Sequence, residues 1–336
     1  MLPVNPLRAL FVIPGQESGS SMIFARRQAH SLAREGVTVQ NFYVRSRTSA
    51  PALAREYFRL REHIARFDPA LIHAQFGTVT AMLAALAAGR RPLAITYRGG
   101  DLNPSPSGNQ VRCRLGRVLS QLAALRAELI VCVSEGLRQR LWWRRERAVV
   151  QPSGVDAEIF RPEARNAART RLGWPPRDRV VLFNAGHDAK NKRLDLALAA
   201  AAAARRRWPN LRLEILDGKV EPDRVPVLMN ASDCLLVTSD TEGSPSVIQE
   251  ALACALPIVS VDVGDAVERL RGIAHTRIVE RDAEQIGRAL AEITAAPLRT
   301  NGPEAARELS FDSIARSLCR RYRESIRNTK EAAKTQ

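Results

Sequence analysis

Short apolar runs alternate along the chain with longer segments in which apolar residues recur every three or four positions. The short runs predict buried strands over residues 9–14, 38–44, 71–75, 93–97 and 129–134, then over 179–186, 211–218, 233–240 and 257–264. The longer segments predict helices between them, among them residues 22–36, 51–67, 80–89 and 111–129. Because strands that alternate with helices form parallel sheets with crossover helices, the sequence predicts an α/β protein with two doubly wound units.

The two series meet near residues 151–156, QPSGVD, where proline and glycine interrupt the pattern. We therefore predict a first domain over residues 1–152 and a second over residues 153–310. A length of 336 residues suits two domains, since domains average about 150 residues. The last helical pattern covers residues 311–328, and the polar residues 329–336 are expected to fray.

The composition, 45% hydrophobic and 26% charged, is that of a soluble folded protein. The first residues, MLPVNPLRALFVIPG, hold one short apolar run, which we interpret as a strand and not as a signal peptide or membrane span. The cysteines lack metal-ligand spacing, which favours a reducing cytoplasm and disfavours structural zinc. They are Cys113, Cys132, Cys234, Cys254 and Cys319.

Positive charge is concentrated in the first half of the chain. Residues 1–150 hold 22 arginines, no lysine and 9 acidic residues, a net +13 of the +16 for the whole chain. This asymmetry predicts an anionic partner: a phosphate-bearing substrate, an acidic lipid surface or a nucleic acid. A nucleic acid is disfavoured because aromatic residues make up only 5% and no binding motif is present. Solvated arginines remain the plain alternative.

The stretch TEGSPSVIQEALACALPIVSVDVG, residues 241–264, sets two glutamates eight positions apart. We predict a helix with Ser244 as its N-cap and Pro245 as its first residue, which puts Glu242 on the preceding loop and Glu250 in the second turn. A helix start at the carboxyl end of a parallel strand favours a phosphate, whereas the two carboxylates would accept hydrogen bonds from hydroxyls. The stretch therefore predicts a sugar-nucleotide site, against the alternative of two solvated glutamates.

This stretch, with MNASDCLLVTSD before it, resembles the Glu-x7-Glu motif of the retaining family-4 glycosyltransferases. VVQPSGVDAEIFRPE resembles the family's interdomain segment, with Ser153 in place of the usual asparagine, and AGHDAKNKRLDLALAA resembles its segment of diphosphate contacts. FDPALIHAQFG, AITYRGGDLN and LIVCVSEGLRQRL match the family's strand ends. The resemblance implies the GT-B fold, in which two Rossmann-like domains face each other across a cleft and the C-terminal helix, here residues 311–336, crosses back to the first domain.

The resemblance also implies roles for residues of the second domain. Glu242 would bind hydroxyls of the donor sugar, Glu250 the ribose, and Lys192 the diphosphate, where its charge would stabilise the leaving group. Glu242 and Lys192 are therefore the predicted catalytic residues. Backbone groups of Ser244, Ser246 and Val247 would complete the donor site, and Pro245 lacks an N–H that many relatives offer.

Two further positions depart from the family pattern. His187 stands where an arginine is common, so either Arg193 compensates or the histidine is partly protonated, and a surface histidine is the alternative. The loop PGQESGSS resembles the glycine loop that approaches the donor phosphate, which makes Gly19 a donor-binding candidate. Gly15 and Gly19 do not form GxGxxG, and a plain βα turn explains them equally.

In the first domain, Arg98 replaces a histidine of the family pattern, and we take Arg98 and Asp101 as acceptor-side candidates. His73 is expected to be a buried histidine bonded to the backbone rather than a catalytic group. The family needs no metal ion, and we expect no metal, no cofactor besides the nucleoside-diphosphate sugar, and no protein nucleophile.

The segment over residues 111–129 has an apolar stripe that we assign to ordinary packing, formed by Val111, Leu115, Val118, Leu122 and Leu125. Its arginines are expected to point outward, toward an anionic membrane surface that carries a lipid-linked glycan acceptor; they are Arg112, Arg114 and Arg117. Trp142 and Trp143 are either membrane-interface residues or packing at a helix end.

The motif is most similar to bacterial enzymes of capsule, exopolysaccharide or teichuronic-acid assembly, which predicts a cytoplasmic enzyme, peripheral on the inner face of the plasma membrane. Three alternatives remain besides a nucleic-acid-binding protein. A glycosidase would need its two carboxyl groups to flank the scissile bond about 5–10 Å apart, which sequence spacing does not establish. A GT-B epimerase or phosphorylase, or a catalytically altered sugar-nucleotide-binding protein, would share the donor site but not the transfer to an acceptor.

Overall fold

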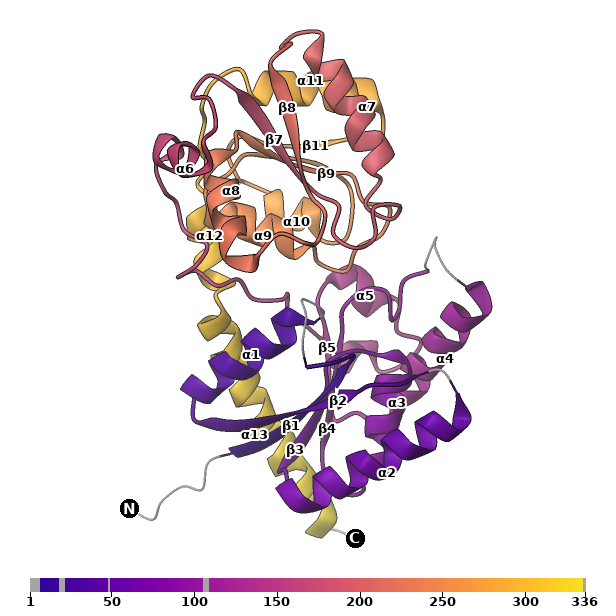
Figure 1. Cartoon of the computed structure of the whole chain (residues 1–336). Coiled ribbons are helices and arrows are strands. Elements are labelled where there is room, and N and C mark those ends of the chain that lie inside the picture. Colours follow the sequence, from indigo (N-terminus) through magenta and orange to yellow (C-terminus); the bar gives the residue numbers. More distant parts are fainter. Residues whose placement is uncertain (1–6, 18–21, 48, 105–108, 335–336) are drawn as a thin grey trace. The chain divides into compact units, whose positions relative to one another are not determined.

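The structure is a computed structural model that describes residues 7–17, 22–47, 49–104 and 109–334. The chain forms two compact units: Met1–Ser153 together with Phe311–Gln336, and Gly154–Ser310. Each unit is a parallel sheet packed against helices (Figure 1). The predicted class, α/β with two Rossmann-like units, is confirmed.

The first unit has a six-stranded sheet in the order β2-β1-β3-β4-β5-β6, with every pair parallel. Its strands are β1 (Leu7–Pro14), β2 (Val37–Val44), β3 (Leu71–Ala74), β4 (Leu93–Tyr97), β5 (Leu129–Cys132) and β6 (Val149–Val150). The apolar runs predicted the ends of β1 to β5 to within two residues. Two-residue β6 is too short to produce a recognisable run.

Helices cover both faces of this sheet (Figure 1). One face is covered by α1 (Ile23–Arg34) and α13 (Phe311–Lys334), and the other by α2 (Ala50–Phe67), α3 (Thr78–Ala87) and α4 (Gln110–Arg126). The short helices α5 (Glu135–Gln139) and η1 (Arg145–Arg147) follow β5. The fraying predicted from residue 329 is wrong, because no glycine or proline interrupts α13 and it continues to Lys334.

The apolar stripe of α4 is exposed, which corrects the assignment to ordinary packing. The five side chains that form it are between 37% and 75% exposed. The inner face of α4 consists instead of small or polar residues, namely Gly116, Ser120, Gln121, Ala123 and Ala124. A Cβ at Gly116 would lie 3.2 Å from Cγ2 of Thr78, so the small inner face lets α4 approach α3 closely, and the larger side chains are left outside.

The second unit has a five-stranded parallel sheet in the order β11-β10-β9-β7-β8. Its strands are β7 (Arg179–Asn184), β8 (Leu211–Leu216), β9 (Cys234–Val237), β10 (Ile258–Val261) and β11 (Thr276–Val279). Its helices are α6 (Arg165–Leu172), α7 (Leu194–Arg205), η2 (Pro222–Arg224), α8 (Val225–Ala231), α9 (Ser246–Ala253), α10 (Ala266–Leu270), α11 (Ala283–Ile293) and α12 (Gly302–Glu308). The alanines of α7 allow α11 to pack closely, since a Cβ at Gly287 would lie 2.5 Å from that of Ala203.

No helix within the described ranges is long and apolar enough to cross a membrane. The five cysteines carry free thiols, and all except Cys113 are buried.

Candidate functional site

The candidate site lies at the carboxyl edge of the second sheet, where the strand order reverses. The chain passes from β7 outward to β8 and then returns to β9 on the other side of β7. The loops after β7 and β9 therefore diverge from two neighbouring strand ends, and in open α/β sheets this is the position where ligands bind.

Side-chain hydrogen bonds tie these two loops together. Asn191 Nδ2 donates to the carbonyl of Thr241 (3.0 Å), and Thr241 Oγ1 donates to Asn191 Oδ1 (2.8 Å). Thr238 Oγ1, just after β9, donates to the carbonyl of Lys192 (2.7 Å). These bonds fix the position of the Lys192 backbone relative to the residues that lead into Glu242.

Lys192 and Glu242 meet across the two loops. Nζ of the lysine lies 2.5 Å from Oε1 of the glutamate, and their side chains are 22% and 17% exposed. The pair thus remains partly open to solvent, so a ligand can reach it. Its ammonium can neutralise a phosphate, and its carboxylate can accept hydrogen bonds from hydroxyls.

The start of α9 differs from the prediction. The helix begins at Ser246, Pro245 occupies the N-cap position, and no side chain caps it. Ser244 is not the N-cap, because its hydroxyl donates to Asp265 Oδ2 (2.9 Å) and accepts from Gln249 Nε2 (3.0 Å). Ser244 therefore ties the Glu242 loop to the loop after β10.

Asp265 is the buried partner of this loop. Arg269 Nε also donates to its Oδ2 (3.0 Å), while Oδ1 has no partner among the described residues. Burial raises the pKa of Asp265 to about 6, and the nearby Arg269 and the Ser244 hydroxyl act in the opposite direction. No motif in the sequence pointed to this carboxyl.

Gly264 was also missed from the sequence, and it shapes the site. Its φ of +62° lies in the left-handed region, and a Cβ there would lie 3.0 Å from the carbonyl oxygen of Gly243 and 3.2 Å from Cβ of Glu242. A glycine is therefore needed for the loop after β10 to pack against the loop that carries Glu242.

The remaining predicted donor residues occupy α9 itself. Ser246 is exposed, Val247 is buried, and half-buried Glu250 lies at the start of the second turn, as predicted. The first N–H groups of a helix have no partner within it, so Ser246 and Val247 stand at an anion-binding position.

His187 and Arg193 lie on the loop after β7. His187 is exposed and packs on Gly218, where a Cβ would lie 2.7 Å from the imidazole. Arg193 binds two carboxylates, Asp195 (2.9 Å) and Asp240 (3.3 Å), and the hydrogen bonds that it donates to both raise its pKa. The guanidinium therefore stays charged, and Arg193 remains the residue expected to compensate for His187.

Arg281, which the sequence analysis did not select, joins two strand ends. Its guanidinium donates to the carbonyls of Thr238 (3.2 Å), Ser239 (2.6 Å) and Asp262 (3.2 Å). It therefore holds the ends of β9 and β10 beside the Glu242 loop.

In the first unit, Asp101 stabilises a loop. Its carboxylate is fully buried and accepts hydrogen bonds from the backbone N–H groups of Gly77 (2.9 Å), Arg98 (3.0 Å) and Gly99 (2.8 Å). This corrects its selection as an acceptor-side candidate, because a carboxylate buried in this way holds the backbone and is closed to a ligand.

Arg98 is half-buried at the end of β4. It donates to the carbonyl and side chain of Gln75 (3.0 and 2.5 Å) and to Ser153 Oγ (3.0 Å), and it stacks over Phe24 with its Cζ 4.2 Å from the ring centroid. Burial lowers its pKa to about 9 while Asp101 acts to raise it, so the guanidinium stays charged at neutral pH. Arg98 remains the acceptor-side candidate of this unit.

Comparison with known proteins identifies the family. Two family models match: Glycosyltransferase Family 4 over residues 20–159 and Glycosyl transferases group 1 over residues 213–295. The structure is also similar to a sucrose-phosphate synthase from Thermosynechococcus elongatus, with a TM-score of 0.74 and 18% identity over 94% of this chain and 98% of that one. The chain belongs to the family-4 glycosyltransferases.

Further relatives of the chain support this family. HepE of Anabaena, solved in complex with UDP-glucose, has a TM-score of 0.70 and 17% identity over 95% of this chain and 100% of that one. A D-inositol 3-phosphate glycosyltransferase of Rhodococcus erythropolis is 30% identical over 217 residues, 54% of this chain and 49% of that protein. The chain spans about half the length of the curated relatives it matches. The fold is confirmed as GT-B.

Gly19 lies outside the described residues; Gly15 has a φ of 108° and donates its N–H to the carbonyl of Val44 (3.0 Å). Within the part of the chain that the structure describes, no three histidine, cysteine, aspartate or glutamate side chains are grouped to hold a metal ion.

Proposed function

We propose that this glycosyltransferase moves a sugar from a nucleoside-diphosphate sugar to a glycan or lipid-linked glycan, without a metal ion and with retention of the anomeric configuration. The observation that carries the proposal is the Lys192–Glu242 pair, held at the switch point beside the start of α9 with Glu250 one turn further on. A cation, free helix N–H groups and two carboxylates match a donor that carries a diphosphate and two sets of hydroxyls.

Each group has a distinct task in this reaction. Lys192 and the N–H groups of Ser246 and Val247 bind the diphosphate, and the lysine charge stabilises the leaving group as the glycosidic bond breaks. Glu242 accepts hydrogen bonds from the donor sugar and Glu250 from the ribose. No protein nucleophile is invoked: an oxygen of the donor's own phosphate assists the acceptor's attack from the same face, which retains the configuration.

For the acceptor, we propose a lipid-linked glycan of capsule, exopolysaccharide or teichuronic-acid assembly, which would place the enzyme at the cytoplasmic face of the plasma membrane. The strongly basic first unit supports an acceptor that carries phosphate. The Rhodococcus relative is named for D-inositol 3-phosphate, so a phosphorylated polyol belongs in the same acceptor screen.

The decisive test is calorimetric binding of UDP, GDP, ADP and their sugars to the wild type and to Glu250→Ala, in EDTA. Loss of charged hydrogen bonds to the ribose should weaken the preferred nucleotide about tenfold or more. Glu284→Ala is the matched control, since this glutamate is exposed on α11 and is expected to leave affinity unchanged. Absence of nucleotide binding at low salt would overturn the proposal.

Turnover separates transfer from the alternatives that share a donor site. Donor consumption that requires an acceptor, with an α-linked donor giving an α-linked product by NMR, is the expected result. Consumption without an acceptor would instead indicate an epimerase or hydrolase. Binding of the donor without its consumption would indicate a sugar-nucleotide-binding protein. Pro245 bears on this outcome, because it lacks a backbone N–H that many relatives offer to the donor.

A further inference from the structure

The outer face of α4 carries a continuous apolar stripe. Val111, Leu115, Val118, Leu122 and Leu125 follow one another at intervals of three and four residues, so they share one side of the helix, and each is exposed. Trp142, which is 58% exposed, adjoins the stripe, since it lines the same cavity as Val118. We call these six side chains the α4 surface.

This concentration of exposed apolar side chains is unusual for the protein. Twelve large hydrophobic residues are exposed among the described residues, and six of them form the α4 surface. Two more, Phe58 of α2 and Leu86 of α3, lie on the helices that cover the same face of the sheet (Figure 1). A contiguous apolar area of this kind marks an interaction site, whereas single exposed apolar residues do not.

Arginines flank the stripe, and the segment of chain that contains it holds no acidic residue. Arg112 and Arg114 lie on opposite sides of it, from the angular spacing of helix positions, and the sequence holds no aspartate or glutamate between Asp101 and Glu128. The α4 surface is therefore apolar along its centre and positive along its edges.

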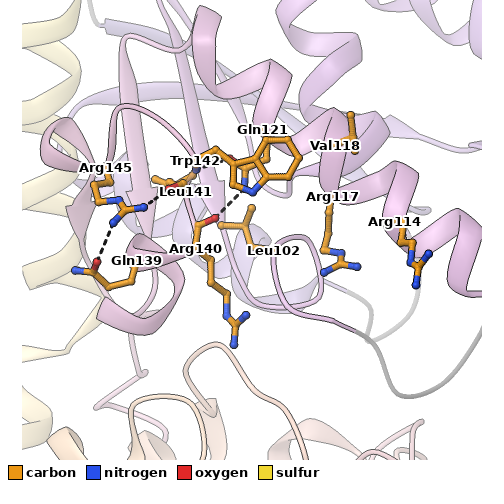
Figure 2. A pocket seen from close by; sticks show the side chains of 10 residues that line it. All are labelled: Leu102, Arg114, Arg117, Val118, Gln121, Gln139, Arg140, Leu141, Trp142 and Arg145. Atoms are coloured by element: carbon orange, nitrogen blue, oxygen red, sulfur yellow. Dashed lines mark hydrogen bonds between the residues drawn. The ribbon is translucent and has the colours of Figure 1, made fainter.

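A cavity of about 480 Å³ adjoins the α4 surface. Figure 2 shows the side chains of Arg114, Arg117 and Arg140 pointing in the same direction. Trp142 and Val118 also line the cavity. None of the described residues that line it is acidic. Nε of Arg117 is buried without a hydrogen-bond partner among the described residues, which is a donor left for a ligand to satisfy.

We propose that the α4 surface docks on an anionic lipid bilayer, with its apolar side chains entering the acyl boundary and the cavity arginines holding a lipid phosphate. A helix with an apolar stripe and basic flanks binds an interface of this kind, since burial of the stripe and attraction to the headgroups act together. Trp142 suits the level of the headgroups because its ring is amphipathic.

Two other occupants fit less well. A second copy of the chain, packed about a twofold axis, would set the same arginines against each other with no carboxylate between them. A nucleic acid would neutralise the arginines, but its phosphate backbone would leave the apolar stripe without a partner.

This inference rests on the proposed function for its biological purpose, because it gives access to a lipid-linked acceptor, but its test is independent of the donor site. Sedimentation with phosphatidylglycerol vesicles is compared with phosphatidylcholine vesicles. Wild type should bind the former, and Leu115→Ser/Leu122→Ser should partition about tenfold less. Arg114→Ala/Arg117→Ala should lose about fivefold per arginine, and the lysine versions should retain most of the binding.

Leu198→Ser is the matched control, since Leu198 is an exposed leucine of the second unit and its loss should change nothing. Nucleotide calorimetry on each variant checks that the protein is folded. It also separates the two proposals, because vesicle binding without nucleotide binding would support membrane docking and contradict the proposed function. The inference would be overturned if the wild type bound neither kind of vesicle. Binding of free pyrophosphate in the cavity would not rescue it. A wild-type dimer in light scattering that Leu115→Ser/Leu122→Ser converts to a monomer would also overturn it.

Discussion

Lys192 and Glu242, fifty residues apart in the chain, form an ion pair with 2.5 Å between Nζ and Oε1. Because both side chains are partly exposed, the pair contributes little to the free energy of unfolding. In the proposed reaction the carboxylate would hold the ammonium in position at the donor site before the diphosphate binds. The two residues are thus expected to act as one unit in catalysis.

Replacing Lys192 with alanine should lower kcat/KM for sugar transfer by about 10²–10³-fold, because the charge that stabilises the leaving diphosphate is removed. Steady-state transfer from the preferred donor measures this. Lys190→Ala is the control, since Lys190 is an exposed lysine of the same loop and should keep full activity. Equal activity of Lys192→Ala and Lys190→Ala would exclude Lys192 from the reaction.

Gly264→Ala should weaken donor binding by about tenfold, a loss of about 1.4 kcal/mol, because the new Cβ would displace the backbone at Gly243 and with it Glu242. Gly272→Ala is a close control: its φ of +75° imposes similar strain, but a Cβ there meets nothing within 4 Å. Both substitutions should lower stability by about 1–2 kcal/mol. Calorimetry of the nucleotide should distinguish them, and equal affinities would show that Gly264 does not support the site.

The fold class could be predicted because strands of parallel sheets are buried on both faces and so appear as continuous apolar runs, as in ALFVIP around β1. The edge strand β11 escaped prediction because its residues, Thr276–Val279, are half-exposed or exposed and its sequence TRIV lacks such a run. The orientation of α4 escaped for another reason. A stripe shows that a helix has an apolar side, but only the small inner residues, such as Gly116 and Ala123, show which side packs.

Of the candidate site, the sequence motif supplied Lys192, Glu242 and Glu250. The residues that position them were missed, because their contacts join segments far apart in the chain. Asn191 and Thr241 bond reciprocally across the loops after β7 and β9, and Asp265 reaches Ser244 from the loop after β10. Such pairings become visible only once the strand order is known.

Asp233→Ala should lower the free energy of unfolding by about 3–5 kcal/mol, because it leaves buried Arg169 without its carboxylate. Asp233 Oδ2 accepts from Arg169 Nη2 and from the backbone N–H of Val180, both at 2.8 Å. Urea unfolding followed by circular dichroism measures the loss. Glu284→Ala breaks an exposed pair with Arg206 and should cost less than about 1 kcal/mol, so equal losses would contradict a structural role for the buried pair.

His73 joins the C-terminal helix to the centre of the first sheet. It is fully buried, as predicted, but its partners are side chains and not the backbone: its Nε2 lies 2.7 Å from Thr96 Oγ1, and its Nδ1 is bonded to the hydroxyl of Tyr322 on α13. Burial, assisted by the charge of Arg98, lowers the pKa of His73 to about 3. The histidine is therefore neutral in the folded protein throughout the range in which the unfolded chain takes up a proton.

The neutral His73 should accordingly contribute to the free energy of unfolding of the wild type. This contribution is full above about pH 6.5, the usual histidine pKa, and declines as the pH falls toward 3. The sign follows because the unfolded state binds the proton and the folded state does not. His73→Gln should remove this contribution, so the difference between the two unfolding free energies changes by about 1.4 kcal/mol per pH unit between pH 6 and 4. His275 is exposed, so the unfolding free energy of His275→Gln should vary with pH in parallel with that of the wild type. A parallel curve for His73→Gln would contradict the lowered pKa of His73.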